Sequence, residues 1–489
     1  MHRLNGEDAG FLYMEGPEQP MNTMAVGFLT PPTGPDGRPR PLTLPQLRAH
    51  LEARLDQLPS FRWRIVAVPL RLHHPVCVRD PAFDLDFHLR TATLAGPGTE
   101  RELDALFSEV AERRLDRRHP LWQVTLVDGL ADGRQALIVK YHHCLADGVA
   151  ALTTFSRVYS DQELPPLPGT EPWEPERLPG RLRLAADALK DHLLASGRIP
   201  RLAARTRRGA AAVKARRATA SVDVPGFSGK APGSLLNDAF TVRRAYARAS
   251  VPLSGAKRIK DAAGVSLNDV ALAIVAGATR RYLDDRGALP AQPLLASVPV
   301  SFEDPQAPVR QAGNRFWSFT TSLATDIDDP WERLAAISAV AAEAKAQLDL
   351  FGVDVVPSWL DHIPPFVAQP GARALVARLR ADRDHADANI LISNVRGPAE
   401  AWHLLGATVD DLYVDGPPSN GVGCNVMLWS YADRLLFGVL SFADALVAPE
   451  DLSAALVASF EELHAAADRH RTGVAPTATT EGTAATSVT

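Results

Sequence analysis

Apolar residues recur first at helical spacing and then at strand spacing in the first third of the chain. Leucines three or four residues apart from Thr43 to about Leu58 predict a helix, and residues 103–110 carry the apolar stripe of a second one. Two strand-like runs follow at 121–127 and 136–142, with two Asp-Gly pairs between them. Turn residues between two such runs predict a β-hairpin.

Helical and strand-like segments alternate in the second half, which begins near Phe240. Strands interleaved with helices predict an α/β domain. The segments read as helix at 265–285, strand at 294–302, helix at 330–348, strand at 388–395, strand at 435–442, and helix from 449 to about 469.

The segment that joins the two halves has two parts of different composition. Residues 163–180 are rich in proline, which a helix or a central strand does not tolerate, so this part is predicted to be an extended linker. Residues 181–217 are rich in Ala, Leu, Lys and Arg, with few acidic residues. Leu182, Ala186, Leu189 and Leu193 form a helical stripe there.

Two interpretations of this basic segment stay open. In the first, the stripe packs the helix on the body of the protein and the charged face is merely solvated. In the second, the segment is a basic amphipathic surface that meets anionic lipid headgroups.

Length and composition limit the class of protein. A chain of 489 residues exceeds the size at which one hydrophobic core usually stops growing, so at least two domains are expected. The net charge of -5 gives no sign of a nucleic-acid-binding protein. We expect an N-terminal domain over 1–160, a linker and basic helical segment over 161–235, a C-terminal domain over 236–471, and a disordered tail over 472–489.

Cysteine usage and the N-terminus bear on the compartment. Cys77, Cys144 and Cys424 are widely spaced and form no disulfide framework. The first residues lack the basic start and the apolar stretch of a signal peptide, and no run of 18 apolar residues occurs. We expect a cytoplasmic protein that does not span a membrane, with peripheral attachment to the inner face of the membrane or to lipid droplets left open.

The stretch "VKYHHCLADGVA" carries the most specific chemistry. His142 and His143 stand at the end of a strand-like run, and Asp147 and Gly148 follow. Three interpretations compete: a structural histidine pair with an Asp-Gly turn, a metal site, and general-base catalysis. Neighbouring residues on a strand point to opposite faces, so the two histidines do not easily share one ion.

General-base catalysis suits an imidazole, which can take a proton from a hydroxyl or an amine as that group attacks an acyl carbon. No G-x-S-x-G elbow supplies a serine nucleophile. Cys144 is a candidate nucleophile by position alone. Direct transfer from an activated acyl donor is therefore the most economical mechanism, with Asp147 bracing the loop and Gly148 leaving room for a substrate.

"HHCLADGVA" resembles the HHxxxDG motif of the CoA-dependent acyltransferase superfamily, which includes chloramphenicol acetyltransferase and nonribosomal peptide condensation domains. Six further segments resemble the bacterial wax ester synthase/diacylglycerol acyltransferase family in the same order. They are "EDAGFLYMEGPEQPM", "FDLDFHLR", "HPLWQVTLVDGL", "SLNDVALAIVAGATRRYL", "GNRFWSF" and "LISNVRGP".

The resemblance implies an α/β, two-domain chloramphenicol acetyltransferase-like fold with an interdomain tunnel and the HHxxxDG loop at its middle. His143 matches the general base, and His142 matches a supporting histidine. Asp147 matches the aspartate that shapes the loop, and Gly148 matches the glycine that keeps the tunnel open.

Asn268 and Asp269 match a conserved Asn-Asp pair of the family that is thought to assist the site from the second domain, and Asn268 is a candidate to stabilise the oxyanion. "SLND" is equally a capping box, in which Asp269 caps the helix start. Gly313 and Asn314 are ambiguous in the same way. Asn5-Gly6, Asn22 and Arg396 depart from the family pattern outside the HHxxxDG loop, so they bear on substrate preference.

The resemblance implies an O-acyltransferase that moves a fatty acyl group from acyl-CoA to a lipid alcohol, giving triacylglycerol from diacylglycerol, wax ester from a long-chain alcohol, or both. Acyl-CoA is a co-substrate, and we expect no other cofactor, no metal and no nucleic acid. Two alternatives stay open: a condensation-type enzyme that acts on an amine or a carrier-bound acyl group, and a lipid-binding homologue without catalysis.

Overall fold

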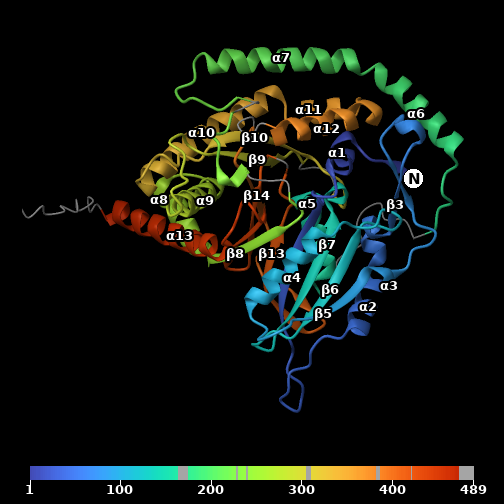
Figure 1. Ribbon diagram of the computed structural model, residues 1–489, viewed down its shortest axis with the longest axis horizontal. Coiled ribbons are helices and arrows are strands. Elements are labelled where there is room, and N and C mark those ends of the chain that lie inside the picture. Colours follow the sequence, from blue (N-terminus) through green and yellow to red (C-terminus); the bar gives the residue numbers. More distant parts are fainter. Residues whose placement is uncertain are drawn as a thin grey trace, which may run out of the picture.

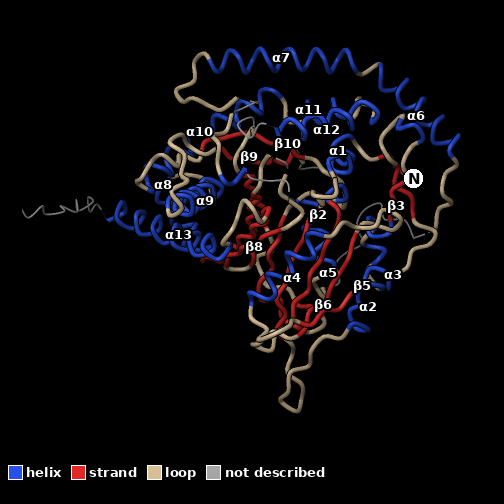
Figure 2. The backbone as a smooth tube through the Cα atoms, viewed as in Figure 1, coloured by secondary structure: helices blue, strands red, loops and turns tan. Residues whose placement is uncertain are grey.

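The computed structural model describes residues 1–162, 174–226, 230–237, 241–303, 310–381, 386–419 and 421–472. Part of the predicted linker, at residues 163–173, and all but the first residue of the predicted tail lie outside these ranges. Two six-stranded sheets dominate the described chain. Figure 2 shows their strands gathered in the middle, with helices around them. This arrangement confirms the predicted α/β class.

The first sheet has the strand order β12-β13-β2-β7-β6-β5. β6 and β7 pair antiparallel, which confirms the predicted hairpin, and β2 pairs with β7 so that Asn22 lies opposite His142. The first predicted helix, α2, ends at Glu52, before the expected Leu58. The elements are β2 (Asn22–Thr30), α2 (Leu44–Glu52), β5 (Leu89–Thr93), α4 (Glu100–Glu112), β6 (Trp122–Asp128), β7 (Gln135–His142) and α5 (Gly148–Val158).

The second sheet has the order β10-β9-β11-β14-β15-β8. Its main helix, α9, packs among α8, α10 and α13, because an unbroken apolar run from Val270 to Ala278 must be covered on all sides. The strands are β8 (Arg244–Pro252), β9 (Leu295–Ser301), β10 (Phe316–Ser322), β11 (Ile390–Arg396), β14 (Cys424–Tyr431) and β15 (Arg434–Phe442). The helices are α8 (Leu253–Ala263), α9 (Leu267–Asp284), α10 (Pro330–Phe351) and α13 (Pro449–Thr472).

Two strands from the second half of the chain complete the first sheet. β13 (Ala407–Asp415) pairs antiparallel with β2, and β12 (His403–Leu404) pairs with β13. The first hydrophobic core accordingly contains Trp402, Leu412 and Trp429 beside residues of the first half. The hydrophobic pattern along the chain does not indicate that these two strands join the first sheet. Their pairing links the two halves of the chain.

A layer of helices lies beside the HHxxxDG loop. α1 (Gly6–Met14) contacts this loop, α11 (Val355–Leu360) and α12 (Pro365–Ala381). α1 begins where the Asn5 side chain accepts a hydrogen bond from the Asp8 N–H at 2.6 Å. Gly6 is required because a Cβ there would lie 2.2 Å from the Leu360 carbonyl carbon. The N-terminal helix is therefore locked between the two halves.

The basic joint forms two helices, α6 (Arg181–Ser196) and α7 (Ile199–Arg217), which run along the outside of the molecule (Figure 1). Of the two open interpretations, the one in which the stripe packs on the body does not hold for Leu182, Leu189 and Leu193: their exposed fractions are 89%, 57% and 76%. Leu184 and Ala188 are buried instead, because α6 contacts the body along a different line. Periodicity reveals an apolar face but not what covers it.

Among the described residues, no single helix is long and apolar enough to cross a bilayer. Together, α8 and α9 meet the length and composition test, with a bend of 106° between them.

Candidate active site

His142 is the last residue of β7, and His143 is the first residue after it. The His142 N–H donates to the Leu121 carbonyl at 2.9 Å, and the His143 N–H donates to the Met21 carbonyl at 2.8 Å. His142 is buried, whereas His143 keeps partial exposure. The chain then makes a short 3-10 turn over residues 143–145 before α5 begins at Gly148. The two imidazoles thus have different surroundings.

Asn314 determines which nitrogen of His143 carries the hydrogen. Its Nδ2 donates to the Asp8 Oδ1 at 2.7 Å and to the His143 carbonyl at 2.9 Å, which uses both amide hydrogens. Its Oδ1 lies 3.1 Å from His143 Nδ1 and therefore accepts from that nitrogen. Nδ1 thus carries the hydrogen in the neutral ring, and Nε2 keeps a free lone pair.

Aromatic rings surround the His143 imidazole. The Phe11 ring stacks on it with centroids 4.0 Å apart, and the Phe316 centroid is 6.2 Å away. Burial lowers the pKa of His143 to about 4, although the charge of Asp147 and the Asn314 bond oppose the shift. The imidazole is therefore neutral near pH 7, the form that a base requires.

Asp147 ties the loop to the second half of the chain. Its Oδ1 accepts from the Val149 and Ala150 N–H groups at 3.1 Å each and so caps α5. Its Oδ2 accepts from the Arg315 N–H at 2.9 Å and from the Arg310 guanidinium at 2.6 Å. Within the described part of the chain, no hydrogen bond joins Asp147 to the His143 ring, so the contacts of Asp147 are those of a brace.

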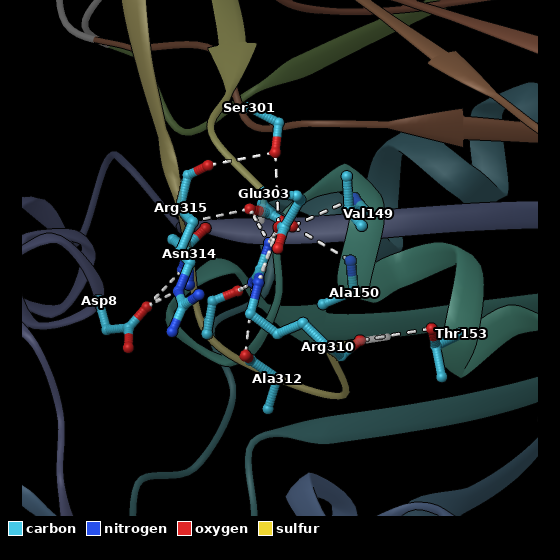
Figure 3. Close-up of polar contacts among 12 residues, drawn as sticks. Asp8, Val149, Ala150, Thr153, Ser301, Glu303, Arg310, Ala312, Asn314 and Arg315 are labelled. Atoms are coloured by element: carbon cyan, nitrogen blue, oxygen red, sulfur yellow. Dashed lines mark hydrogen bonds and ion pairs between the residues drawn. The ribbon is translucent and has the colours of Figure 1, made fainter. Parts of the chain in front are cut away.

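Arg310 donates hydrogen bonds to several acceptors near Asp147, and Figure 3 shows it between Glu303 and Ala312. It pairs with Glu303 at 2.5 Å and also donates to the Gly313 carbonyl. The Gly313 N–H donates back to the Leu145 carbonyl at 2.6 Å. Asp8 holds the next residue, Asn314, through its backbone N–H at 2.7 Å. These contacts fix the 310–315 loop against the HHxxxDG loop.

His142 belongs to a separate buried group. Its Nδ1 accepts from the Cys144 N–H at 3.1 Å, and its Nε2 lies 3.6 Å from Glu15 Oε1. Glu15 also pairs with Arg117 at 2.7 Å. The neighbouring Cys144 is fully buried, and burial raises the pKa of its thiol well above the ordinary range. A thiolate nucleophile is not favoured there.

An apolar cavity of about 920 Å³ lies next to this site, between α1, β10 and the helices α10 to α12. Phe11 and Phe316, the two rings beside His143, form part of its wall. His143 itself is not among the described residues of the wall. The other lining residues include Gly6, Glu7, Gly10, Met14, Trp317, Phe319, Leu348, Phe351, Leu360, Ile363 and Leu375.

The contacts found for Gly148 and Asp269, two of the remaining predicted site residues, are with residues other than His143. A Cβ on Gly148 would be 2.5 Å from the Val395 Cγ2, so this glycine allows β11 to approach the loop. The Asp269 carboxylate accepts from the Ser266 N–H at 2.9 Å and completes a capping box. Within the described ranges, no hydrogen bond connects Asn268 or Asp269 with His143, and neither lines the cavity.

Asp8, Phe11 and Arg310 are the residues that sequence reasoning did not single out. The acidic and aromatic residues of "EDAGFLYME" were visible, but no local pattern links Asp8 to Asn314, 306 positions away.

Acyl-CoA was the only co-substrate expected, and no group of His, Cys, Asp and Glu in the described ranges could hold a metal ion.

The comparisons with known proteins cover nearly the whole chain. The model described as the wax ester synthase/diacylglycerol acyltransferase catalytic domain matches residues 4–271, and the WS/DGAT C-terminal domain model matches 312–464. Two Mycobacterium tuberculosis proteins named putative diacylglycerol O-acyltransferases are 35% and 36% identical over 474 residues. The match covers 96% of this chain in both cases, and 97% and 98% of those proteins.

Two solved structures share the architecture. The wax ester synthase/diacylglycerol acyltransferase from Marinobacter aquaeolei VT8 aligns with a TM-score of 0.65 and 27% identity, covering 96% of this chain and 100% of that one. The first condensation domain of the CDA synthetase aligns with a TM-score of 0.58 and 13% identity, covering 95% and 96%. The second similarity shows the fold alone, and it confirms the predicted two-domain acyltransferase fold.

Proposed function

The chain belongs to the wax ester synthase/diacylglycerol acyltransferase family and is an acyl-CoA-dependent O-acyltransferase, and we propose that His143 is its general base. The arrangement of Asp8, Asn314 and His143 carries this assignment, since it leaves Nε2 as the free nitrogen of the ring. A base must be unprotonated at working pH, and burial lowers the pKa of His143 enough to ensure this.

The reaction then follows from this geometry. Nε2 takes the proton of a lipid hydroxyl while the hydroxyl oxygen attacks the thioester carbonyl carbon. The resulting tetrahedral oxyanion collapses, and the carbon–sulfur bond breaks. The imidazolium returns its proton to the CoA thiolate, so one ester and one free CoA leave the enzyme. The Asn314 bond keeps Nδ1–H in place through both proton transfers.

The cavity supports a lipid substrate. Its wall is mainly aromatic and aliphatic, and a volume of about 920 Å³ is large enough for an extended acyl or alkyl chain. We propose a fatty acyl group as the donor, with diacylglycerol or a long-chain alcohol as the acceptor. The family assignment does not favour a carrier-dependent condensation enzyme or a lipid-binding protein without catalysis.

The direct test is an assay of purified protein with radiolabelled palmitoyl-CoA. Separate reactions receive hexadecanol, diacylglycerol or no acceptor. Labelled wax ester or triacylglycerol that depends on the acceptor is the expected result. Label recovered only as free palmitate, in equal amounts with and without acceptor, would contradict the proposal.

We also propose that the protein attaches peripherally to a lipid surface through α6 and its surroundings. α6 exposes Leu182, Leu189 and Leu193 between basic residues, a pattern that suits an anionic interface. The short turn over residues 69–71 contacts both α6 and α12, and Leu70 in this turn is 81% exposed. Phe366 and Val367 on α12 are about half exposed, close to Ala368 and Leu375 in the cavity wall.

The basic residues of α7 fall into two groups. Arg205 pairs with Asp354 at 2.7 Å, and Arg216 pairs with Glu343 at 2.7 Å, so these two arginines hold α7 on the body. Arg201, Arg207 and Arg208 form the second group: they are exposed, and no ion pair to any of them is found in the part of the chain that the structure describes. The second group suits attraction to anionic headgroups, each contributing about 1 kcal/mol at low salt.

Vesicle flotation tests this attachment. Binding to phosphatidylglycerol vesicles is expected at low salt and should weaken at high salt. Replacing Leu182, Leu189 and Leu193 by Ser, or Arg201, Arg207 and Arg208 by Gln, should weaken binding but keep turnover of detergent-dispersed substrate. Arg205→Gln is the matched control with little expected effect on binding. Absence of binding at low salt, or binding that ignores both sets, would contradict the proposal.

A further inference from the structure

Glu7 is a buried carboxyl group in the wall of the apolar cavity. It lies in the first turn of α1 and is 8% exposed. Its Oε1 has no hydrogen-bond partner within the described structure, although it is buried. Burying such an oxygen costs stability, and proteins therefore rarely leave one unpaired without a use for it. The mechanism derived above does not use this group.

Glu7 lies on the same face of α1 as Phe11, the residue that stacks on the His143 ring. Gly6, Glu7, Gly10, Phe11 and Met14 share the face of α1 that lines the cavity. Phe11 is one helical turn beyond Glu7, and its ring stacks on His143 with centroids 4.0 Å apart. The Glu7 side chain thus lies one turn from the residue that covers the base.

The charges around Glu7 favour its neutral form. Burial raises the pKa of Glu7 to about 8, and the neighbouring carboxylate of Asp8 adds to this shift. The Phe316 backbone N–H opposes the shift, as does the more weakly acting Arg310, while Asp147 reinforces it. A neutral carboxyl group can both donate and accept a hydrogen bond, which a carboxylate cannot do.

We propose that Glu7 is a substrate-contacting residue whose carboxyl group forms a hydrogen bond with an oxygen of the substrate in the cavity. This inference rests on the acyl transfer proposed above. The oxygen belongs either to the acceptor hydroxyl, which Glu7 would orient toward Nε2, or to the thioester carbonyl, whose developing negative charge Glu7 would stabilise by donation. Either substrate oxygen can form this hydrogen bond with Glu7 Oε1, which has no hydrogen-bond partner among the described residues.

Glu7→Leu and Glu7→Gln separate these possibilities. Glu7→Leu keeps the approximate size but removes the hydrogen bond, whereas Glu7→Gln keeps a neutral donor and acceptor. Met14→Leu is the matched control, since Met14 lines the same face without a strong polar atom. Turnover is measured while palmitoyl-CoA and hexadecanol are varied in turn, and circular dichroism checks the fold of each variant.

A contact to the acceptor predicts that Glu7→Leu raises KM for hexadecanol about tenfold with little change in kcat. A contact to the thioester oxygen predicts that kcat falls about tenfold with both KM values unchanged. Either result supports the proposal if Glu7→Gln stays within about threefold of wild type. Should Glu7→Leu not fold, Glu7→Ala replaces it.

The proposal is overturned if the nonpolar variant matches wild type in all three constants, or if Glu7→Gln is impaired as much as Glu7→Leu. The acyl-transfer activity of the wild-type enzyme distinguishes this outcome from failure of the proposed function. Acyl transfer by wild type with unaffected Glu7 variants removes only the role of Glu7. Absence of acyl transfer by wild type removes both.

Discussion

Two neighbours of His143 act on its ring in complementary ways. Asn314 holds the hydrogen on Nδ1, and Phe11 covers one face of the ring. The first contact decides which nitrogen is the base, and the surrounding burial decides at which pH it is free. Neither effect depends on a charged partner in direct contact with the ring.

The lowered pKa of His143 predicts an unusual pH dependence. The pKa falls from the ordinary 6.5 to about 4 through burial, so the ring stays neutral as pH drops from 7 to about 5. We expect kcat/KM to change less than about threefold over that range and to fall as pH passes through about 4. NMR titration of the ring resonance, assigned with His143→Gln, checks the group directly. Protonation near pH 6.5 would contradict this account.

Asp147 predicts a loss of stability together with activity. Asp147→Asn removes the ion pair with Arg310 at 2.6 Å and weakens the cap of α5. The free energy of unfolding should fall by about 1–3 kcal/mol, because the Arg310 guanidinium, whose side chain is 11% exposed, loses a charged acceptor. Glu303→Gln is the more exposed control and should cost less. A fully stable Asp147→Asn with only a displaced pH profile would make Asp147 a direct participant in proton transfer.

The sequence could predict only part of the site. The spacing of "HHCLADG" identified His142, His143 and Asp147, because these residues are close in the chain. Asn314 was noted in the sequence with an ambiguous role, but Asp8 and its contact with Asn314 escaped prediction because that contact depends on the tertiary fold. Asn268 and Asp269 were matched by motif, but the same four letters encode a helix cap, and the Ser266–Asp269 capping box is the contact that the structure has.

At the scale of elements, the start of α5, directly after the HHxxxDG loop, packs against β11 of the second half. Gly148 starts α5 against the Val395 side chain of β11, and Asp147 caps the same helix. The helix start, the loop and the strand therefore share one small contact. A side chain at residue 148 would require the Val395 side chain to move.

Gly148→Ala should consequently destabilise the fold. The added Cβ would be 2.5 Å from Val395 Cγ2, a distance that forces the valine to move. We expect a loss of about 1–3 kcal/mol in the free energy of unfolding. Val395→Ala in the same chain should restore part of it, because it removes the clashing methyl group. Denaturant titration measures both, and additive losses in the double variant would refute the contact.

Hairpins and core helices were predictable from local patterns, whereas edges and exposed faces were not. β6 and β7 were read from apolar runs around Asp-Gly pairs. The leucine stripe of α6 was visible as a periodic pattern, but the pattern left open whether the stripe packs on the body or faces outward, and most of it is exposed. Whether a face is covered depends on distant parts of the chain, here the turn over residues 69–71.

At the scale of the whole molecule, the exchange of β12 and β13 joins the halves into one cooperative unit. β13 pairs with β2 along most of its length, and Leu412 and Val414 are buried in the core of the first half. The cavity and the Asp147–Arg310 contact also draw on both halves. Neither half is complete without the other.

Leu412→Ala should therefore weaken both halves together. Removing this fully buried side chain should cost about 2–5 kcal/mol and lower Tm in a single transition. Hydrogen exchange should become faster in β7 and in β14 alike. A matched exposed change, Leu405→Ala, should have little effect, because Leu405 is 37% exposed. Two separate unfolding transitions would contradict the joint unit.

The central claim, that His143 is the base of acyl transfer, is tested most directly by the turnover of His143→Ala with palmitoyl-CoA and an acceptor that wild type uses. The variant should keep its fold, because the Asp147 contacts that brace the loop do not involve the His143 ring, and lose at least about a hundredfold in turnover. His142→Ala should lose less, since its Nε2 faces Glu15 rather than the cavity. A folded His143→Ala that turns over at the wild-type rate would contradict the mechanism.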